Sequence, residues 1–515
     1  MKQLRDASQV WDIIVIGGGA TGLGTALDAA SRGYSTLLLE RSDFARGTSS
    51  RSTKLIHGGV RYLQQGNISL VLEALRERGN LLKNAPHVVH NSAFVVPAYR
   101  WWEIPFYVTG LKLYDLLAGK RGLGPSRWLS KAETLKRIPT LKDEGLKGGI
   151  LYHDGQFDDS RLAVNLMQTL LEQGGKALNY TSVTGLLKSD GQVTGVSAVD
   201  TETGEEFSIT SKVVINATGV FTDSVRQMDR PETEPIITVS QGVHIVLDRE
   251  FLPGNSALMI PKTEDGRVLF AVPWHNRLIV GTTDTPVPTP SEEPIPEQSE
   301  IRFLLKHSAK YLTKAPTRED IRSVFTGLRP LVKPAREEST KTISREHTII
   351  TDSSGLVTIT GGKWTTYRQM AEETVDHAAS EARLPETPSI TRTLALHGSS
   401  VELRQDSESA LHLYGCDAPL LKKLTGEEPS WNNPMHKDLT IIPAEVIWAV
   451  RHEMARTVED VLARRTRALF LDARASLAIS EKVARLMAGE LDRDEQWVKD
   501  QVSVFRATAS HYLPG

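Results

Sequence analysis

The first forty residues alternate apolar runs with a glycine-rich turn. Residues 12–16 form a short apolar run, residues 20–32 are rich in Ala and Leu, and residues 35–40 are again apolar up to a terminal Glu. A short run, a helix-length stretch and a second short run predict a βαβ unit with two parallel strands. We therefore expect a parallel sheet to begin near the start of the chain.

Further apolar runs lie well downstream and fall into two groups. Residues 213–215 form a short run that we expect to join the first two strands, which makes that domain discontinuous. Between residues 236 and 284, short apolar runs alternate with Asp, Gly, Pro and Asn, a pattern typical of a largely antiparallel sheet. We predict that this second sheet covers a ligand bound to the first.

The last part of the chain changes to helical spacing after a Pro-containing stretch at residues 384–389. The helices expected there cover residues 444–455, 458–470, 481–487 and 497–505. The predicted domains are a doubly wound α/β domain over residues 11–80, 150–230 and 350–380, an antiparallel-sheet domain over 81–149 and 231–349, and a helical domain over 395–515.

Composition narrows the class of protein. The 515 residues are 40% apolar and 24% charged, as in a soluble globular protein of two or three domains. A formal charge of -2 argues against a nucleic-acid partner bound by bulk electrostatics. One cysteine, Cys416, excludes an internal disulfide, and no metal-ligand cluster stands out, so we expect no metal. The residues before Trp11 contain no apolar stretch, so we do not expect a cleaved signal peptide. No apolar run is long enough to predict a membrane-spanning helix.

The turn after the first apolar run has the sequence G-x-G-x-x-G. Gly17 permits the tight turn, Gly19 lets a pyrophosphate approach the N-terminus of the helix, and Gly22 allows close packing of helix on strand. Glu40, which ends the second strand, is expected to accept hydrogen bonds from ribose hydroxyls. The motif predicts a dinucleotide. Its N-terminal position, the long insertion before residues 216–219 and a late Gly pair favour FAD over NAD.

The segment 47–63 follows directly and is dense in hydroxyls, glycines and cations. Small residues let the backbone approach a flat ring and a diphosphate, while Lys54 and Arg61 are expected to neutralise anionic groups. An ordinary polar loop is the alternative. This segment resembles the flavin-binding signature of the FAD-dependent glycerol-3-phosphate dehydrogenases. The resemblance runs from about Asp12 to Ala378 and on through the C-terminal helices, with further matching pieces at 158–162, 216–219, 242–246, 281–284, 327–331 and 361–368.

The resemblance implies a fold like that of glutathione reductase and the amino-acid oxidases, with non-covalent FAD. It implies oxidation of sn-glycerol 3-phosphate to dihydroxyacetone phosphate by hydride transfer from C2 to flavin N5, with electrons then passed to a membrane quinone. The cofactor-binding residues indicated by the motifs and the resemblance are Gly17, Gly19, Gly22, Glu40, Thr48, Ser49, Ser50, Lys54, Leu55, His57, Ala217, Thr218, Gly219, Gly362, Lys363 and Thr365.

The residues implied around the substrate are Arg61, Tyr62, Arg329, Arg345 and Lys363. Arginine suits this site because its planar fork binds phosphate oxygens in bidentate fashion. His244 is implied as the base that takes the C2 hydroxyl proton, although its apolar neighbours also fit a buried sheet histidine. His57 is the rival base, and Lys363 is expected to stabilise negative charge on the alkoxide or the reduced flavin.

The segment 96–125 combines aromatic residues with flanking cations. Trp101, Trp102 and Phe106 precede Lys120 and Arg121, as in an amphipathic element at a membrane surface. Core packing is the alternative. The resemblance favours peripheral contact with lipid, which would place the protein in the cytoplasm on the inner face of the cell membrane. Whether it forms a homodimer stays open.

Two other functions remain compatible with the motifs. One is an oxidase of the same fold that reduces oxygen and acts on glycerol phosphate or an amino acid. The other is a flavin-binding interaction module without turnover.

Two further features have structural interpretations. Asp158 and Asp159 are expected to cap a helix beginning near Arg161. The basic residues of the C-terminal helices, 444–451 and 458–465, are interpreted as a solvated face.

Overall fold

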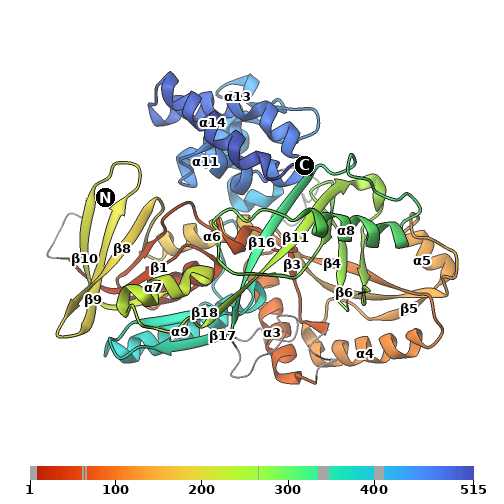
Figure 1. Cartoon of the computed structure of the whole chain (residues 1–515), viewed down its shortest axis with the longest axis horizontal. Coiled ribbons are helices and arrows are strands. Elements are labelled where there is room, and N and C mark those ends of the chain that lie inside the picture. Colours follow the sequence, from red (N-terminus) through yellow and green to blue (C-terminus); the bar gives the residue numbers. More distant parts are fainter. Residues whose placement is uncertain (1–8, 61–62, 64–65, 265, 334–346, 400–410) are drawn as a thin grey trace.

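The computed structural model describes residues 9–60, 63, 66–264, 266–333, 347–399 and 411–515, which form two sheets and a cluster of C-terminal helices (Figure 1). The predicted βαβ unit is confirmed, because β1 pairs in parallel with β2 and also with β10. The strand order of this first sheet is β17 (His347–Thr351), β18 (Val357–Gly361), β10 (Glu206–Asn216), β1 (Val10–Ile16), β2 (Thr36–Leu39) and β7 (Lys176–Leu178), with the hairpin of β8 (Thr181–Ser189) and β9 (Gln192–Asp200) joined to β10.

The two faces of β1 lie in different parts of the core. Ile13 and Val15 are fully buried against helices on one face. Ile14 and Ile16 point the other way, into a cluster with the β8–β9 hairpin, as the alternation of side chains along a strand requires. The helices on the first face are α1 (Ala20–Ser31), α6 (Asp159–Glu172) and α9 (Tyr367–Glu381). The short α7 (Thr222–Asp229) contacts β8, β10 and β18.

The second sheet is largely antiparallel, as predicted for residues 236–284. β11 is its longest strand and pairs with β14, β15 and β16. Its strands in order are β15 (Thr285–Val287), β11 (Ile237–Asp248), β14 (Arg277–Gly281), β13 (Leu269–Trp274), β12 (Ser256–Ile260), β4 (Val89–Ala98), β6 (Gly148–Phe157) and β3 (Leu55–Ile56), with β16 (Ser323–Val332) on β11 and β5 (Arg127–Ser130) on β6.

The division between the two domains differs from the predicted boundaries. β3 and β6 pair with each other in the second sheet, although the sequence had placed them in the nucleotide-binding domain. β3 has two residues and β6 has ten, and the partners of both are fixed by tertiary pairing rather than by local pattern. The helices packed around this sheet are α3 (Ile68–Asn84), α4 (Glu103–Ala118), α5 (Lys131–Arg137) and α8 (Gln298–Tyr311).

The C-terminal helices, blue in Figure 1, lie together above the two sheets. They are α10 (Ala418–Leu424), α11 (Pro443–His452), α12 (Ala468–Leu471), α13 (Ala473–Leu491) and α14 (Glu495–Ser510). The single helix predicted over 458–470 is instead a π-helical turn at Asp460–Arg465, then Arg467 in the left-handed region at φ 62°, then α12.

The basic residues of that turn are not a solvated face. Arg464, Arg465 and Arg467 are only 2%, 3% and 2% exposed, and their guanidinium groups pair with Asp43 and Asp159 of the nucleotide-binding part. A π turn holds more residues than an α turn, which lets consecutive arginines point inward. Arg464 also pairs with Glu459 and Asp460 nearby in the sequence. The prediction was wrong here because Asp43 and Asp159, which draw these arginines into the interior, lie hundreds of residues away in the sequence.

Candidate functional site

Two adjoining cavities lie where the first sheet meets the second. The smaller, of about 380 Å³, is lined by residues of the glycine turn and of the strand ends around it. The larger, of about 570 Å³, is lined by residues of β11 and β16 and by Thr282, Thr283 and Asp284, which follow β14. Both are lined by Thr48, Pro330, Gly361, Gly362, Lys363 and Trp364. The two cavities meet at these residues, which suits a dinucleotide in one and a reacting ring with its substrate in the other.

The glycine turn has the geometry that its sequence predicts. Gly17 has a φ of 108°, and a Cβ there would lie 2.7 Å from the carbonyl oxygen of Ala217. A Cβ on Gly22 would lie 1.9 Å from the carbonyl oxygen of Gly17, so Gly22 serves close packing rather than ligand contact. Ser49 Oγ accepts a hydrogen bond from the Ala20 N–H at 2.9 Å, at the first turn of α1. The helix end and its loop can hold a diphosphate.

Glu40 lines the smaller cavity beside this turn. Its carboxylate accepts hydrogen bonds from the Gly18 N–H at 2.6 Å and the Ser42 N–H at 2.9 Å. Burial raises the pKa of Glu40, and these two hydrogen bonds oppose that rise. Because a carboxylate has about four acceptor positions, Glu40 can shape the loop and still accept ribose hydroxyls. Ala217, Thr218 and Gly219 line the same cavity. This set of residues fits the adenosine and diphosphate half of FAD.

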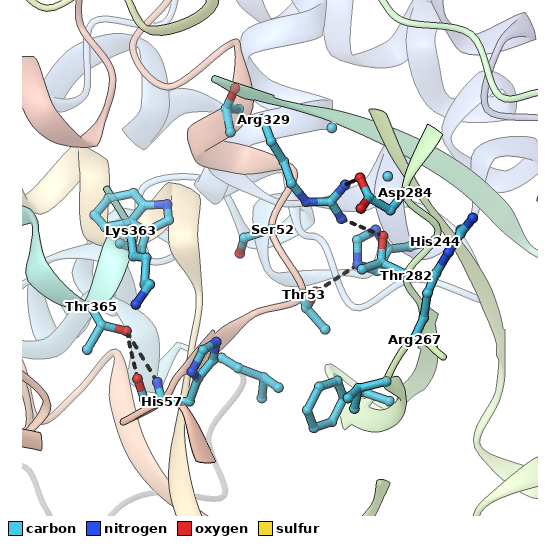
Figure 2. A pocket seen from close by; sticks show the side chains of 18 of the residues that line it. Ser52, Thr53, His57, His244, Arg267, Thr282, Asp284, Arg329, Lys363 and Thr365 are labelled. Carbon is cyan, nitrogen blue, oxygen red and sulfur yellow. Dashed lines mark hydrogen bonds and ion pairs between the residues drawn. The ribbon is translucent and has the colours of Figure 1, made fainter. Parts of the chain in front are cut away.

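His244 lies in the wall of the larger cavity and is 2% exposed. Its Nε2 is 2.9 Å from Thr53 Oγ1 (Figure 2). Its ring stacks on Phe325 with centroids 4.6 Å apart. A Cβ on Gly281 of the paired strand would lie 2.1 Å from the imidazole, so glycine is required to make room for the ring. Nδ1 is buried and has no hydrogen-bond partner among the described residues.

The electrostatic surroundings keep His244 uncharged. Burial lowers the pKa of His244 well below its usual value, and the nearby cations of Lys54 and Arg329 lower it further. A neutral imidazole can accept a proton, whereas an imidazolium cannot. His244 is therefore chemically suited to the role of base that the sequence assigned to it.

Arg329 of β16 extends into the larger cavity on the same side as His244 (Figure 2). Its Nη2 donates to Thr282 Oγ1 and to the Thr283 carbonyl, both at 3.1 Å, while Nη1 lies 3.5 Å from Asp284 Oδ1. A Cβ on Gly242 would lie 2.2 Å from Nη2, so this glycine makes room for the guanidinium. Arg329 is thus held in one orientation with its charge directed at the cavity.

His57, Lys363 and Thr365 occupy the opposite wall (Figure 2). The hydroxyl of Thr365 lies 3.3 Å from both the backbone N and the backbone O of His57, which ties the two segments together. Lys363 lines both cavities. Trp364 Nε1 donates to the Ser49 carbonyl at 2.8 Å, so this segment is also fixed to the diphosphate loop. The region where the cavities join is therefore built from segments distant in sequence.

Some predicted residues lie elsewhere. Arg61, Tyr62 and Arg345 fall outside the described residues. Leu55, Thr48 and Gly362 line the larger cavity as expected, whereas Ser50 and Lys54 line neither. The Lys54 ammonium points into the interior and pairs with Asp159 at 2.6 Å, so its charge is not directed at a ligand. Asp158 caps α6 by accepting from the Arg161 N–H, as predicted, but Asp159 serves Lys54 instead.

Arg267, Thr282 and Asp284 are among the residues of the larger cavity that sequence reasoning missed. Thr282 and Asp284 orient Arg329 (Figure 2), and Arg267 also lines the cavity, with its guanidinium carbon 5.2 Å from the centre of the Phe303 ring. The segment Gly281–Asp284 had matched a family motif, which was the available signal. This segment reaches Arg329 because β14 and β16 both pair with β11, a tertiary arrangement that the motif does not indicate.

Comparison with known proteins gives matches over nearly the whole chain. Residues 12–368 match the FAD dependent oxidoreductase family, and residues 356–498 match the C-terminal domain of alpha-glycerophosphate oxidase. The mitochondrial glycerol-3-phosphate dehydrogenase of Rattus norvegicus is 42% identical over 546 residues, covering 100% of this chain and 74% of the rat protein. The Arabidopsis thaliana mitochondrial enzyme SDP6 is 40% identical over 96% of this chain and 85% of its own length.

A solved structure shows the same architecture. The glycerol-3-phosphate dehydrogenase from Bacillus halodurans, complexed with FAD, has a TM-score of 0.80 and 30% identity, covering 98% of this chain and 96% of that one. The similarity therefore includes the nucleotide-binding sheet, the second sheet and the C-terminal helices. On this full-length similarity in sequence and structure, the chain belongs to the family of FAD-dependent glycerol-3-phosphate dehydrogenases.

Proposed function

We propose that this protein oxidises sn-glycerol 3-phosphate to dihydroxyacetone phosphate with FAD as cofactor, and that the electrons pass to a membrane quinone. The observation that carries the proposal is the buried, uncharged His244 beside Arg329 in a cavity that adjoins the dinucleotide-binding turn. The names of the full-length relatives support the substrate. Bound FAD supplies the hydride acceptor, the N5 atom of its flavin ring.

The substrate phosphate binds to the cationic wall of the larger cavity. Arg329 presents a guanidinium whose orientation is fixed by Thr282 and Asp284, so little side-chain entropy is lost when it binds phosphate oxygens. Arg267 contributes a further positive charge from the same side. Arg61, Tyr62 and Arg345 remain proposed substrate ligands through the family resemblance. Lys363, from the opposite wall, stabilises the negative charge that develops as the hydroxyl loses its proton.

His244 accepts the proton of the substrate C2 hydroxyl. We assign this step to Nε2, because Nδ1 is buried and Nε2 is the nitrogen that contacts Thr53, itself a cavity residue. The Thr53 hydroxyl and the Phe325 ring fix the plane of the imidazole. His57 lines the same cavity and is the alternative base.

Anaerobic addition of glycerol 3-phosphate to the FAD-loaded protein is expected to bleach the yellow flavin absorbance rapidly, whereas glycerol, which lacks the phosphate, should bleach it only slowly. Absorbance that persisted after addition of the phosphate ester would refute the substrate. Peroxide formed in stoichiometric amounts under air would favour an oxidase. Reduction of a quinone analogue without peroxide would favour a dehydrogenase.

The proposed membrane contact rests on α4 and the turn before it. Trp101, Trp102 and Leu116 are 67%, 61% and 76% exposed, and Phe106 is 55% exposed. Several exposed large apolar side chains so close in the sequence are typical of an interaction surface, and the cations that follow α4 suit anionic headgroups. Among the described residues, no helix is long and apolar enough to cross a membrane. We place this surface on the inner face of the cell membrane.

Replacing Trp101 and Trp102 together by serine is expected to lower the fraction of protein that sediments with anionic lipid vesicles by about fivefold or more, because each Trp loses over 1 kcal/mol of apolar transfer. Turnover with a water-soluble quinone analogue should stay near the wild-type value. Leu420→Ser is the matched control, since Leu420 on α10 is 55% exposed and lies in the C-terminal region. Equal sedimentation of the wild type, the double Trp variant and Leu420→Ser would show that α4 and the turn before it do not bind the membrane.

A further inference from the structure

Lys54 is a fully buried lysine directly behind the active site. Its side chain is 0% exposed, and its Nζ donates to the Ser50 carbonyl at 2.8 Å and to Asp159 Oδ2 at 2.6 Å. The rings of Trp274, Phe325 and Phe470 surround the ammonium at 5.4, 5.0 and 5.3 Å. Burying a lysine is costly, and a position paired in this way suggests a function beyond packing.

An arginine of the C-terminal region binds Asp159, the carboxylate of α6 that pairs with Lys54. Arg467, just before α12, donates through Nη2 to Asp159 Oδ1 at 3.1 Å and to the Ser50 carbonyl at 2.7 Å. Asp159 Oδ2 also accepts from the backbone N–H and the hydroxyl of Ser52. The loop from Ser50 to Lys54 is therefore fixed by one carboxylate of α6 and one arginine of the C-terminal region.

Both ends of this cluster reach His244. Thr53, within the same loop, contacts His244 Nε2 at 2.9 Å. Phe325 lies against the imidazole at 4.6 Å and also against the Lys54 ammonium at 5.0 Å. The positive charge of Lys54 acts on His244 across this short, dry path, where charge interactions are stronger than in water.

We infer that Lys54, held by Asp159 and Arg467, is a positioning residue that keeps His244 uncharged and correctly oriented for proton transfer. This inference rests on the proposed function of His244 as the base. It also gives the C-terminal helical region a part in the active site, because Arg467 supplies one of the two cations that balance Asp159.

The charged groups around the pair make the direction of the effect definite. Lys54 is paired with Asp159, with Asp158 on the same helix and Arg467 nearby, and burial lowers the pKa of Lys54 to about 7. His244 is influenced by Lys54 and by Arg329, which is itself paired with Asp284. As the pH falls, Lys54 takes up a proton before His244 does, and its charge then opposes protonation of the imidazole.

The test is the pH dependence of kcat/KM for glycerol 3-phosphate, measured on FAD-loaded enzyme. In Lys54→Met the opposing charge is absent, so the acidic limb that reports protonation of His244 is expected to move to higher pH by about one unit. Asp159→Asn removes the same charge in a second way. Without the carboxylate, Lys54 stays uncharged to lower pH and no longer opposes protonation of His244, so the acidic limb should again move to higher pH. Lys54→Arg, which keeps the charge, should leave the limb near its wild-type position.

Arg161→Gln is the matched control. Arg161 is a buried arginine of the same helix that pairs with Glu453 of the C-terminal region, and neither residue lines the cavities. It should lower the midpoint of thermal unfolding without moving the acidic limb. An unmoved limb in folded Lys54→Met and Asp159→Asn, or an equal shift in Arg161→Gln, would overturn the inference. If His244→Asn retains the acidic limb, the assigned base is wrong, and that outcome is separate from the behaviour of the Lys54 variants.

Discussion

Replacing His244 by asparagine is expected to lower kcat with glycerol 3-phosphate by about 10² to 10⁴-fold, the usual contribution of a positioned general base. KM should change little, because the imidazole acts on the C2 hydroxyl proton in the transition state rather than on the phosphate. Asparagine retains a hydrogen-bonding side chain that can still reach Thr53. The loss of kcat would therefore report the absence of the imidazole base rather than a structural change in the cavity wall.

The measurement is stopped-flow reduction of the flavin under anaerobic conditions, which isolates the chemical step from reoxidation by quinone. His57→Asn is the matched comparison, since His57 lines the same cavity from the opposite wall. A small loss in His57→Asn beside a large one in His244→Asn would assign the base to His244. The reverse order would assign it to His57 and leave His244 as a buried sheet histidine.

Removing the guanidinium of Arg329 is expected to raise KM strongly. Arg329→Ala loses charge-assisted hydrogen bonds to phosphate worth together about 3–4 kcal/mol, so kcat/KM should fall by about 10² to 10³-fold. Arg329→Lys should recover only part of this loss, because a lysine cannot keep the paired contacts with Thr282 and Thr283 while binding phosphate.

Two comparisons make this result specific to phosphate. The slow oxidation of glycerol, which carries no phosphate, should be unchanged in Arg329→Ala. Arg322→Ala is the control variant, because Arg322 precedes the same strand and pairs with Asp248 without lining either cavity. An equal loss with both substrates would mean that Arg329 supports the sheet rather than the phosphate.

Local pattern was sufficient for the nucleotide-binding unit. The strand, the glycine turn and the acid at the end of the second strand all lie within thirty residues, and their spacing fixes β1, α1 and the position of Glu40. The antiparallel sheet was predictable for the same reason, since its turns separate each run from the next. His244 and Arg329 required the family resemblance, because neither residue type in its local context identifies a base or a phosphate ligand.

What sequence reasoning missed depends on contacts between distant segments. Lys54 looks like a cation available to a ligand until α6 brings Asp159 to within 2.6 Å of it. Arg464 and Arg465 look solvated because arginine is usually exposed, and only the packed structure shows both against Asp43. The pairing of β3 with β6 likewise had no local signal. These errors share one cause, which is that charge pairs and strand pairs are chosen by the tertiary fold.

The pairing of Asp43 with the C-terminal arginines has a consequence for how the chain matures during synthesis. Asp43 is fully buried, and its pKa is lowered to about 2 despite burial because Arg465 and Arg464 lie against it. Arg465 donates to its carboxylate at 2.7 and 2.8 Å, and Arg464 donates to it through Nε. A buried carboxylate without such partners costs several kcal/mol. The ribosome makes Asp43 long before either arginine, so the loop beside the dinucleotide cavity cannot reach its final structure until Arg464 and Arg465 have emerged. β1 thus belongs to a cofactor site that is completed only after Arg464 and Arg465 have been made.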